Sequence, residues 1–222
     1  TFFELMLNGA SLPDARIRRA VELALDKELL CQHSTNGLGT VTDSSIPPTS
    51  PYAGEGSAAG RDVETAKALL EEAGYDGRTY RLALMQQNLA DAGISISIET
   101  VDSATMFAGM SDGTYDMGIA SHTPGPLPLW FVGTRLTENN NIFHVSDLSE
   151  YGVYIQRIQM ETDPDAKQDL VQALEDYLAQ ERPFVPLWFG TALHAQSPTV
   201  SGIDYASSSF SNENVWEWEK QE

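Results

Sequence analysis

This chain has little cysteine, few basic residues and no long apolar run. Its single cysteine, Cys31, excludes an intrachain disulfide, a four-cysteine zinc site and a CxxC redox motif. Cys31 falls on the apolar side of an expected helix, which favours a buried, inert thiol over a nucleophile. Because no run of about 18 apolar residues occurs, we expect no transmembrane helix and no direct insertion into a membrane. The N-terminus also lacks the basic and then apolar layout of a signal peptide.

The scarcity of basic residues leaves a strong negative charge. There are 13 Lys and Arg residues against 32 Asp and Glu residues, which gives a formal net charge of −19. Such a charge repels nucleic-acid phosphates and anionic lipid head groups, so neither nucleic acid nor a membrane surface is an expected partner. A solvated acidic surface is the favoured interpretation, ahead of a role in binding cations. The length of 222 residues suits one large α/β domain.

Motifs for catalysis and for cofactors are also missing. Residues 34–60 are rich in Gly, Ser, Thr and Pro, but a dinucleotide-binding loop would follow a strand, and here Pro47 and Pro48 come first. The lysine of a Walker motif is absent, as is a G-x-S-x-G elbow. The 4 histidines do not fall at metal-ligand spacing. These absences disfavour an enzyme and a metal site, with a hydrolase of unknown class as the enzymatic alternative.

Hydrophobic periodicity predicts a chain that alternates strands with helices. Strands are expected at Thr1–Leu7, Tyr80–Leu84, Ile94–Ile98, Met117–Ala120 and Phe184–Phe189, the last with Pro186 at an edge or a bulge. Helices are expected from Asp14 through Leu30, from Asp62 to Gly74, at Met85–Ala92, Ser103–Met110 and Asp147–Met160, and from Asp163 to Pro183. Arg16, Arg18 and Arg19 are placed on the solvated face of the first helix. The strand, helix and strand of residues 94–120 predict a parallel crossover.

The stretch Tyr115–Trp130 is the candidate wall of a binding site. Its strand, Met117–Ala120, runs into a loop whose three prolines and Gly125 prevent a helix or a strand ladder from continuing. In open α/β sheets, ligands bind in the crevice outside the carboxyl ends of strands. We therefore expect this loop to face a ligand.

Four stretches carry motifs that recur in the same order in a known protein family. They are Leu12–Glu28, similar to D-x-R-V-R-x-A … A-I-D-R-E, Ala66–Tyr75, similar to A-K-x-L-L-x-E-A-G-Y, Leu89–Ile94, similar to L-x-x-x-G-I, and Arg182–Leu187, similar to x-P-x-I-P-L. Together they resemble the extracellular solute-binding proteins of family 5, the dipeptide-, oligopeptide- and nickel-binding receptors of ABC importers. The match extends over nearly the whole chain and is specific to the family, though not to a ligand.

The resemblance implies an α/β fold of the type II periplasmic-binding-protein kind, in which a mixed, mainly parallel sheet is flanked by helices. It also implies a longer parent protein with two lobes that close on a ligand. Residues 1–222 are expected to be the carboxyl-terminal lobe, with 1–8 and about 190–222 as hinge and return segments toward an absent amino-terminal lobe. The implied function is that of the substrate-binding component of an ABC importer, which works in the periplasm or outside the cell with a membrane permease as its partner. The resemblance also implies no cofactor and no catalysis.

The same resemblance bears on the ligand site. In peptide-binding members, the segment after the Tyr-Asp strand carries a tryptophan and an acidic residue that pairs with the α-amino group of the ligand. Here His122 stands about where the tryptophan would be, and residues 121–130 contain no acid. Peptides lead the implied ligands, with nickel chelates, opines and oligosaccharides behind. We expect Ser121, His122 and Thr123 to hydrogen-bond a polar ligand and Trp130 to stack on it, although a core Trp130 and a satisfied loop histidine explain these residues equally well.

The tryptophans also suggest a third class of function. Trp188, Trp216 and Trp218 could form the exposed aromatic patch of a protein-interaction domain. Trp216 and Trp218, two residues apart on a strand, would face the same way and require a partner surface. An absent second lobe would explain these aromatic residues as well.

One junction predicts that residues are missing from the chain. The strand that ends at Leu84 runs directly into the helix that begins at Met85, whereas a connection from a strand to a helix normally takes about 2–6 residues. We therefore expect a deleted or unseen loop at this junction. An intact mass above the 24.3 kDa of the printed sequence would confirm the missing residues, and agreement with 24.3 kDa would contradict them.

Overall fold

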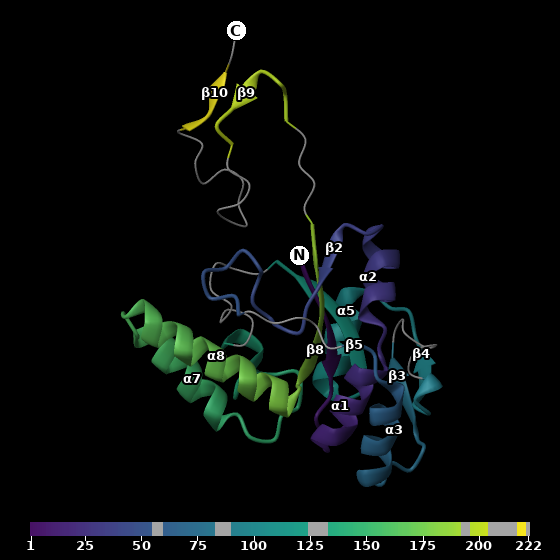
Figure 1. Ribbon diagram of the computed structural model, residues 1–222. Helices are drawn as coiled ribbons and strands as arrows, with labels where there is room; N and C mark the ends of the chain where they lie inside the picture. Colours follow the sequence, from purple (N-terminus) through teal and green to yellow (C-terminus); the bar gives the residue numbers. More distant parts are fainter. Residues whose placement is uncertain (55–59, 83–89, 124–132, 192–195, 204–216, 221–222) are drawn as a thin grey trace.

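The computed structural model describes residues 1–54, 60–82, 90–123, 133–191, 196–203 and 217–220 of the chain (Figure 1). Its helices are α1 (Ala15–Ala24), α2 (Lys27–Thr35), α3 (Val63–Glu72), α5 (Ser103–Asp112), α7 (Ser149–Met160) and α8 (Pro164–Glu181). Its strands are β1 (Phe2–Leu7), β2 (Gly39–Val41), β3 (Thr79–Leu82), β4 (Ser95–Ile98), β5 (Met117–His122), β6 (Leu136–Thr137), β7 (Asn140–Asn141), β8 (Phe184–Gly190), β9 (Val200–Ser201) and β10 (Glu219–Lys220). Within these residues, no helix combines the length and the apolar character needed to cross a membrane.

The main sheet has four strands in the order β2-β8-β1-β5, and every neighbouring pair in it is antiparallel. The expectation of a mainly parallel sheet is therefore wrong, although strands alternate with helices as predicted. β5 and β8 both enter the sheet at the end where β1 leaves it. Hydrogen bonds from Asn8 N to Asp116 O, at 2.8 Å, and from Leu7 N to Pro183 O, at 3.0 Å, mark that end. Strand periodicity predicts which segments are extended, but it does not say from which end a partner strand enters.

The parallel crossover forms at a different place from the expected one. β4 pairs with β3 in parallel, with Thr79 opposite Ser95 and Leu82 opposite Ile98, in a separate two-stranded sheet. The predicted partner of β4 was β5, which instead pairs with β1. The crossover therefore connects β3 to β4, because the order of elements along the chain does not decide which strands share hydrogen bonds.

β1 occupies the middle of the main sheet and is buried on both faces. Leu5 and Leu7 belong to a core with α1, α3 and the β3–β4 sheet, whereas Phe2 and Met6 belong to a second core with α5, α7 and α8. These four side chains have 0% exposure, and the burial of each contributes about 1.5–3 kcal/mol. Burial on both faces explains why every residue from Phe2 to Leu7 except Glu4 is apolar, and the predicted strand is confirmed.

The first helix differs from its prediction. It is two helices, because the chain leaves α1 at Leu25 in an extended conformation and Asp26 caps α2 by accepting a hydrogen bond from Leu29 N at 2.9 Å. Leu29, expected on the apolar face, is 44% exposed. Arg18, expected on a solvated face, is buried and donates hydrogen bonds to backbone oxygens, among them Leu12 O at 2.6 Å. The apolar spacing continues across the break, so periodicity alone does not reveal it.

Other expected helix boundaries are confirmed. Asp62, Asp102 and Asp163 cap α3, α5 and α8, and each accepts a hydrogen bond from the backbone N–H three residues further on. Gly74 follows α3 with a φ of +66°, the left-handed conformation expected of a helix stop. Cys31 is buried, as predicted, and burial raises the pKa of its thiol.

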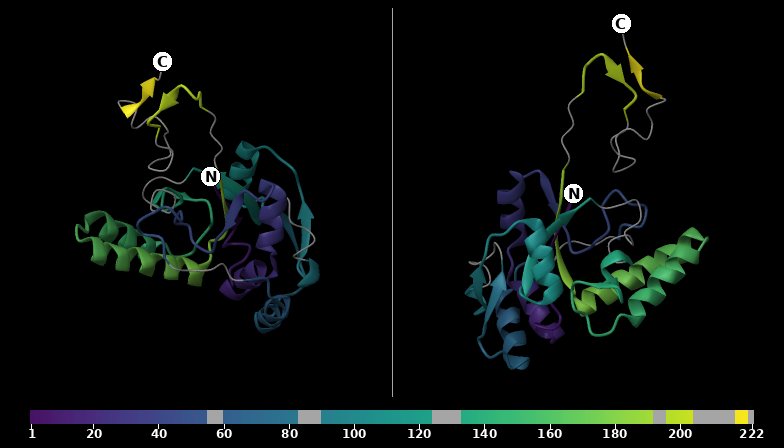
Figure 2. Two further views of the ribbon diagram at one scale, coloured as in Figure 1. Left: turned by 45° about the horizontal axis from the view of Figure 1, so that its top comes forward. Right: turned by 180° about the vertical axis from the view of Figure 1, so that it is seen from behind.

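β1 begins and β8 ends at the same end of the main sheet. Thr1 O accepts a hydrogen bond from Gly190 N at 2.7 Å, so β1 starts where β8 stops. Beyond β8, the β9–β10 pair lies apart from the helices and the main sheet in every view (Figures 1 and 2). The role of residues 1–8 and about 190–222 as connections to another lobe stays a prediction. The junction Leu84–Met85 lies outside the described residues.

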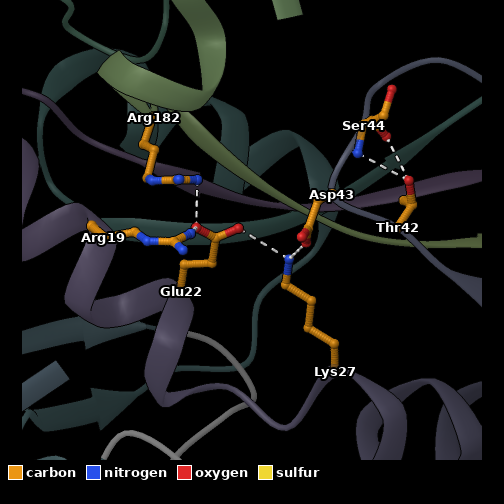
Figure 3. Close-up of polar contacts among 7 residues, drawn as sticks. All are labelled: Arg19, Glu22, Lys27, Thr42, Asp43, Ser44 and Arg182. Atoms are coloured by element: carbon orange, nitrogen blue, oxygen red, sulfur yellow. Dashed lines mark hydrogen bonds and ion pairs between the residues drawn. The ribbon is translucent and has the colours of Figure 1, made fainter. Parts of the chain in front are cut away.

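A network of buried ion pairs connects the segment after β2 to the helices (Figure 3). Glu22, on α1, is 3% exposed. Its ion-pair partners are Arg19, Lys27 and Arg182. Lys27 Nζ lies 3.1 Å from Glu22 Oε1 and also pairs with Asp43. The network joins α1, α2, the residue after α8 and the loop after β2, and it supplies the counter-charges that buried ions require.

Removal of Glu22 should destabilise the fold strongly. In a Glu22→Ala variant, three cations would lose their shared counter-charge, and breaking a buried pair in this way typically costs about 3–5 kcal/mol of unfolding free energy. Glu64→Ala is the matched control, since the Glu64 side chain is 88% exposed and pairs with an exposed lysine, so its unfolding midpoint should hardly move. Urea unfolding followed by circular dichroism measures both. Equal midpoints for the two variants would contradict a structural role for the network.

Candidate functional site

Three of the predicted ligand-binding residues, Ser121, His122 and Thr123, lie at the end of β5. Ser121 and His122 are the last residues of the strand, which is two residues longer than predicted, and Thr123 follows it. Ser121 and Thr123 are exposed, and His122 is half-buried. Trp130, with the rest of residues 124–132, lies outside the described part of the chain.

Strand geometry separates Ser121 from His122. In the register of β5 with β1, Ser121 lies opposite Phe3 and His122 lies opposite Phe2. Since successive side chains point to opposite faces of a strand, these two residues face opposite sides of the sheet. The His122 ring meets the Phe2 ring edge-on, with centroids 5.1 Å apart, on the face that packs against α5, α7 and α8. The described part of the chain therefore does not bring the side chains of Ser121 and His122 into one pocket.

His122 instead meets Glu4, a buried acid in the middle of β1. Glu4 is 0% exposed and, by strand alternation, shares its face with Phe2 and Met6. Its Oε1 lies 4.0 Å from His122 Nδ1 and 3.8 Å from Arg135 Nη1. Both distances exceed hydrogen-bonding range, and neither oxygen of Glu4 accepts a hydrogen bond from any described residue. A buried carboxyl group without hydrogen bonds is rare in folded proteins.

Arg135 completes this group, which we refer to as the Glu4 cluster: Glu4, His122 and Arg135. Arg135 directly precedes β6, and its guanidinium lies over the Phe107 ring of α5, 4.7 Å from the ring centroid. The exposed fractions of the side chains increase from 0% in Glu4 to 9% in His122 and 17% in Arg135. The cluster is therefore most open to solvent at Arg135.

Burial determines the protonation of the Glu4 cluster. It raises the pKa of Glu4 well above the usual range, and the charge of Arg135 opposes that rise. Burial, together with Arg135, lowers the pKa of His122 to about 4, so the imidazole is neutral at pH 7. Burial also lowers the pKa of Arg135, although an arginine side chain stays charged in proteins. The cluster thus combines a cation, a neutral imidazole and a carboxyl group whose charge depends on its surroundings.

An irregularity in the sheet lies beside Glu4. β1 and β8 change register between Phe3 and Glu4, where Phe3 faces Trp188 and Glu4 faces Pro186. Leu187 has no opposite residue on β1 in this bulge, and Pro186 has no N–H to donate to β1. The prediction that Pro186 lies at an edge or a bulge is confirmed for the bulge. Bulges are common next to functional sites because they change the direction of nearby side chains.

Sequence reasoning missed Glu4 and Arg135. Periodicity treats Thr1–Leu7 as an apolar run and passes over Glu4 within it. A usable signal exists there, because a charged residue inside a strand that is apolar on both faces is unusual. Arg135 carries no comparable signal, since only the folded chain brings it next to β1.

The remaining candidate features are the predicted aromatic patch and a possible metal site. Trp188 is 3% exposed and stacks on Phe3 with ring centroids 5.2 Å apart, so its expected place in an exposed aromatic patch is wrong. Trp216 lies outside the described residues, and Trp218 is half-buried. In the part of the chain that the structure describes, no three His, Cys, Asp or Glu side chains gather as metal ligands would.

Comparison with known proteins identifies one matching family and several relatives. The family described as bacterial extracellular solute-binding proteins, family 5 Middle, matches residues 1–143. The glutathione-binding protein GsiB of Shigella dysenteriae is 24% identical over 214 residues, which cover 85% of this chain and 42% of that protein. The nickel-binding periplasmic protein of Escherichia coli is 22% identical over 236 residues, which cover 91% of this chain and 45% of that protein. The chain therefore spans less than half the length of these relatives.

Solved structures share the fold. The periplasmic binding protein DppA from Helicobacter pylori, in complex with peptide STSA, matches with a TM-score of 0.82 and 16% identity over 100% of this chain and 47% of that one. NikA from Brucella suis, in complex with Fe(III)-EDTA, matches with a TM-score of 0.78 and 22% identity over 94% of this chain and 49% of that one. At these identities the likeness concerns the fold, which is the α/β fold of periplasmic binding proteins.

Replacement of Glu4 by glutamine should stabilise the protein, and more so as the pH rises. Below about pH 4.3, glutamic acid is protonated in the unfolded chain, so burial of Glu4 carries no charge penalty there. Because the pKa of Glu4 is raised in the folded protein, the folded state holds more protons than the unfolded chain as the pH rises, and its stability falls. A Glu4→Gln variant has no such proton. The difference in unfolding free energy between the two proteins should therefore grow from about pH 4 toward neutrality.

Urea unfolding at a series of pH values measures this difference. His122, with its lowered pKa, changes stability in the opposite direction over part of the range, so the two proteins are compared at each pH. Glu64→Gln removes an exposed carboxylate and is the control for the loss of one negative charge from an acidic chain. A Glu4→Gln variant that is less stable than the unsubstituted protein at pH 7 would contradict the assignment of Glu4 as a buried acid that costs stability.

Proposed function

The chain belongs to the bacterial extracellular solute-binding proteins of family 5, and from that premise we propose that it is the carboxyl-terminal lobe of the substrate-binding component of an ABC importer. In this role it captures a small solute in the cleft between two lobes and presents it to a membrane permease. It does so in the periplasm or outside the cell. The family match over residues 1–143 carries the proposal, and the fold shared with periplasmic binding proteins supports it.

The arrangement of the chain supports one lobe of a type II fold. The chain covers 42% of GsiB and 45% of the nickel-binding relative, which leaves room in such proteins for a second lobe. Thr1 and Gly190 are bonded at one end of the main sheet, and the β9–β10 pair lies beyond that end (Figure 2). A second lobe joined there would face Ser121, His122 and Thr123, and closure would enclose a ligand between them.

A peptide is the first ligand class of this proposal, and a metal chelate is the second. DppA from Helicobacter pylori is in complex with a peptide, and GsiB is named for glutathione. The nickel-binding relative and NikA with Fe(III)-EDTA support the second class. In either case Ser121, His122 and Thr123 are proposed to hydrogen-bond the polar atoms of the ligand, and Trp130 to stack on it.

Binding without catalysis agrees with the names of the relatives, which are binding proteins. The Glu4 cluster contains no serine, threonine or cysteine, so it offers the hydrolase alternative no hydroxyl or thiol nucleophile. The proposal includes no cofactor. Its partners are the solute and the permease.

The chain alone should bind solutes weakly, because one lobe presents only part of the cleft surface. Thermal-shift measurements with a panel of tripeptides, glutathione and nickel–histidine complexes test this, since a ligand that binds the native state raises its melting temperature. We expect a clear shift for a longer protein that carries both lobes and almost none for this chain. High-affinity binding by the isolated chain would contradict the single-lobe proposal. A two-lobed protein that responds to no member of the panel would count against both ligand classes.

A further inference from the structure

We infer that this protein is adapted to a medium of high ionic strength, in which dissolved salt screens the repulsion between its surface carboxylates. The α7–α8 hairpin, residues 149–181, is the part of the fold whose stability depends most on that screening. The inference concerns the mobile ions around the chain and assigns no bound cation to any group of acids. It goes beyond the proposed solute-binding function and does not depend on it.

The few basic residues of the chain leave its negative charge at the surface. They number 13 against 32 acidic residues. Arg18 and Lys27 are buried, and the Arg182 side chain is only 14% exposed, so these three cations act within the fold and neutralise little of the surface. A net charge of −19 opposes the compact state, because folding brings like charges closer together.

Repulsion is concentrated in the α7–α8 hairpin. Its sequence has 8 Asp and Glu residues against 2 basic residues. Of these acids, only Glu181 forms an ion pair with a described residue, namely Arg18 at 3.7 Å. Asp165, Asp169 and Asp176 are exposed along α8, and the first two are four residues apart. Side chains at that spacing are neighbours on a helix, and a pair of like charges there destabilises it.

Exposed acids elsewhere in the chain have cationic partners. Asp91 lies 2.7 Å from Arg61, and Glu99 lies 3.2 Å from Arg81. Salt weakens such pairs, whereas it relieves the repulsion in the hairpin, so it acts in opposite directions on these two parts of the surface. Exposed ion pairs contribute little to stability, and unpaired acids outnumber them in the hairpin, so the net effect of salt is to stabilise the fold.

Apolar contacts attach the hairpin to the rest of the fold. Tyr151, Val171 and Leu174 belong to the same core as Phe2 and Met6 of β1. The hairpin itself lies to one side of the main sheet and extends away from it (Figures 1 and 2). Repulsion among its acids therefore opposes the contacts that hold it, and it is the element expected to loosen first when salt is withdrawn.

The range of electrostatic interactions sets the salt concentration that the fold requires. The Debye length is about 8 Å at 0.15 M salt and about 3 Å at 1 M. Side chains four residues apart on a helix have Cβ atoms about 5–6 Å apart. Neighbouring carboxylates on α8 thus still repel each other at about 0.15 M and are largely screened at about 1 M. The fold should gain stability between these two concentrations.

Urea unfolding followed by circular dichroism tests the inference, because urea is uncharged and leaves the ionic strength unchanged. We expect the unfolding midpoint of the chain to rise from about 0.05 M to about 1 M sodium chloride, as the repulsion is screened. Potassium chloride should give the same rise, since a diffuse ion atmosphere does not distinguish the two cations.

Two double variants with the same net charge locate the repulsion. Asp169→Asn with Asp176→Asn removes two unpaired acids from the hairpin, whereas Asp91→Asn with Glu99→Gln removes two acids that have cationic partners. At about 0.05 M salt, the hairpin variant should lower the unfolding equilibrium constant by at least about threefold, and the difference should nearly vanish at 1 M. The control variant should gain less at low salt, because it also loses two ion pairs.

Hydrogen exchange followed by mass spectrometry shows which element responds. Amides of α7 and α8 should lose more protection than those of β1 when salt is lowered. A midpoint that stays constant with salt would overturn the inference, and a rise with only one of the two cations would replace it with a specific cation site. Equal behaviour of the two variants, or equal changes in protection at the hairpin and at β1, would overturn the assignment to the hairpin.

Discussion

A strand that is buried on both faces connects the two cores of this chain. β1 contributes side chains to a core under α1 and α3 and to a second core under α5, α7 and α8. Because β5 and β8 pair with β1 on its two sides, a change in its position would disturb both cores and the whole sheet. Nearly every position of β1 is therefore restricted to apolar residues. Glu4 is the exception, and it gives an otherwise apolar sheet a polar centre close to its exposed end.

Burial makes Glu4 unfavourable for the stability of the fold. An apolar residue would suit its place between Phe2 and Met6, because both of these neighbours on the same face of β1 are fully buried. Its neighbours reduce the free-energy cost of burying the Glu4 carboxyl group but do not remove it, since Arg135 supplies a positive charge and His122 stays neutral. The network around Glu22 shows the alternative, in which buried charges are paired directly and serve the fold. The two buried acids thus differ in pairing, since the oxygens of Glu4 accept no hydrogen bond from the described residues whereas Glu22 has three ion-pair partners.

Local signals in the sequence predicted much of the fold but little of the site. Asp62, Asp102 and Asp163 marked helix starts correctly because a cap needs only the residues that follow it. Asp26 is also a cap, yet the apolar spacing on both sides of it concealed the break between α1 and α2. His122 was singled out and lies at the end of β5, whereas its neighbours Glu4 and Arg135 were not, because nothing in the sequence near them records their contact.

The sequence by itself determined the order of strands and helices, most of their boundaries and the resemblance to a family. Periodicity, caps and short motifs depend on residues close together in the chain, and such residues are already close together before folding. Only the tertiary structure decided that the main sheet is antiparallel, that β4 pairs with β3, and that Glu4, His122 and Arg135 meet. These features depend on contacts between distant segments, which are selected by the packing of two cores around β1 rather than by any local preference.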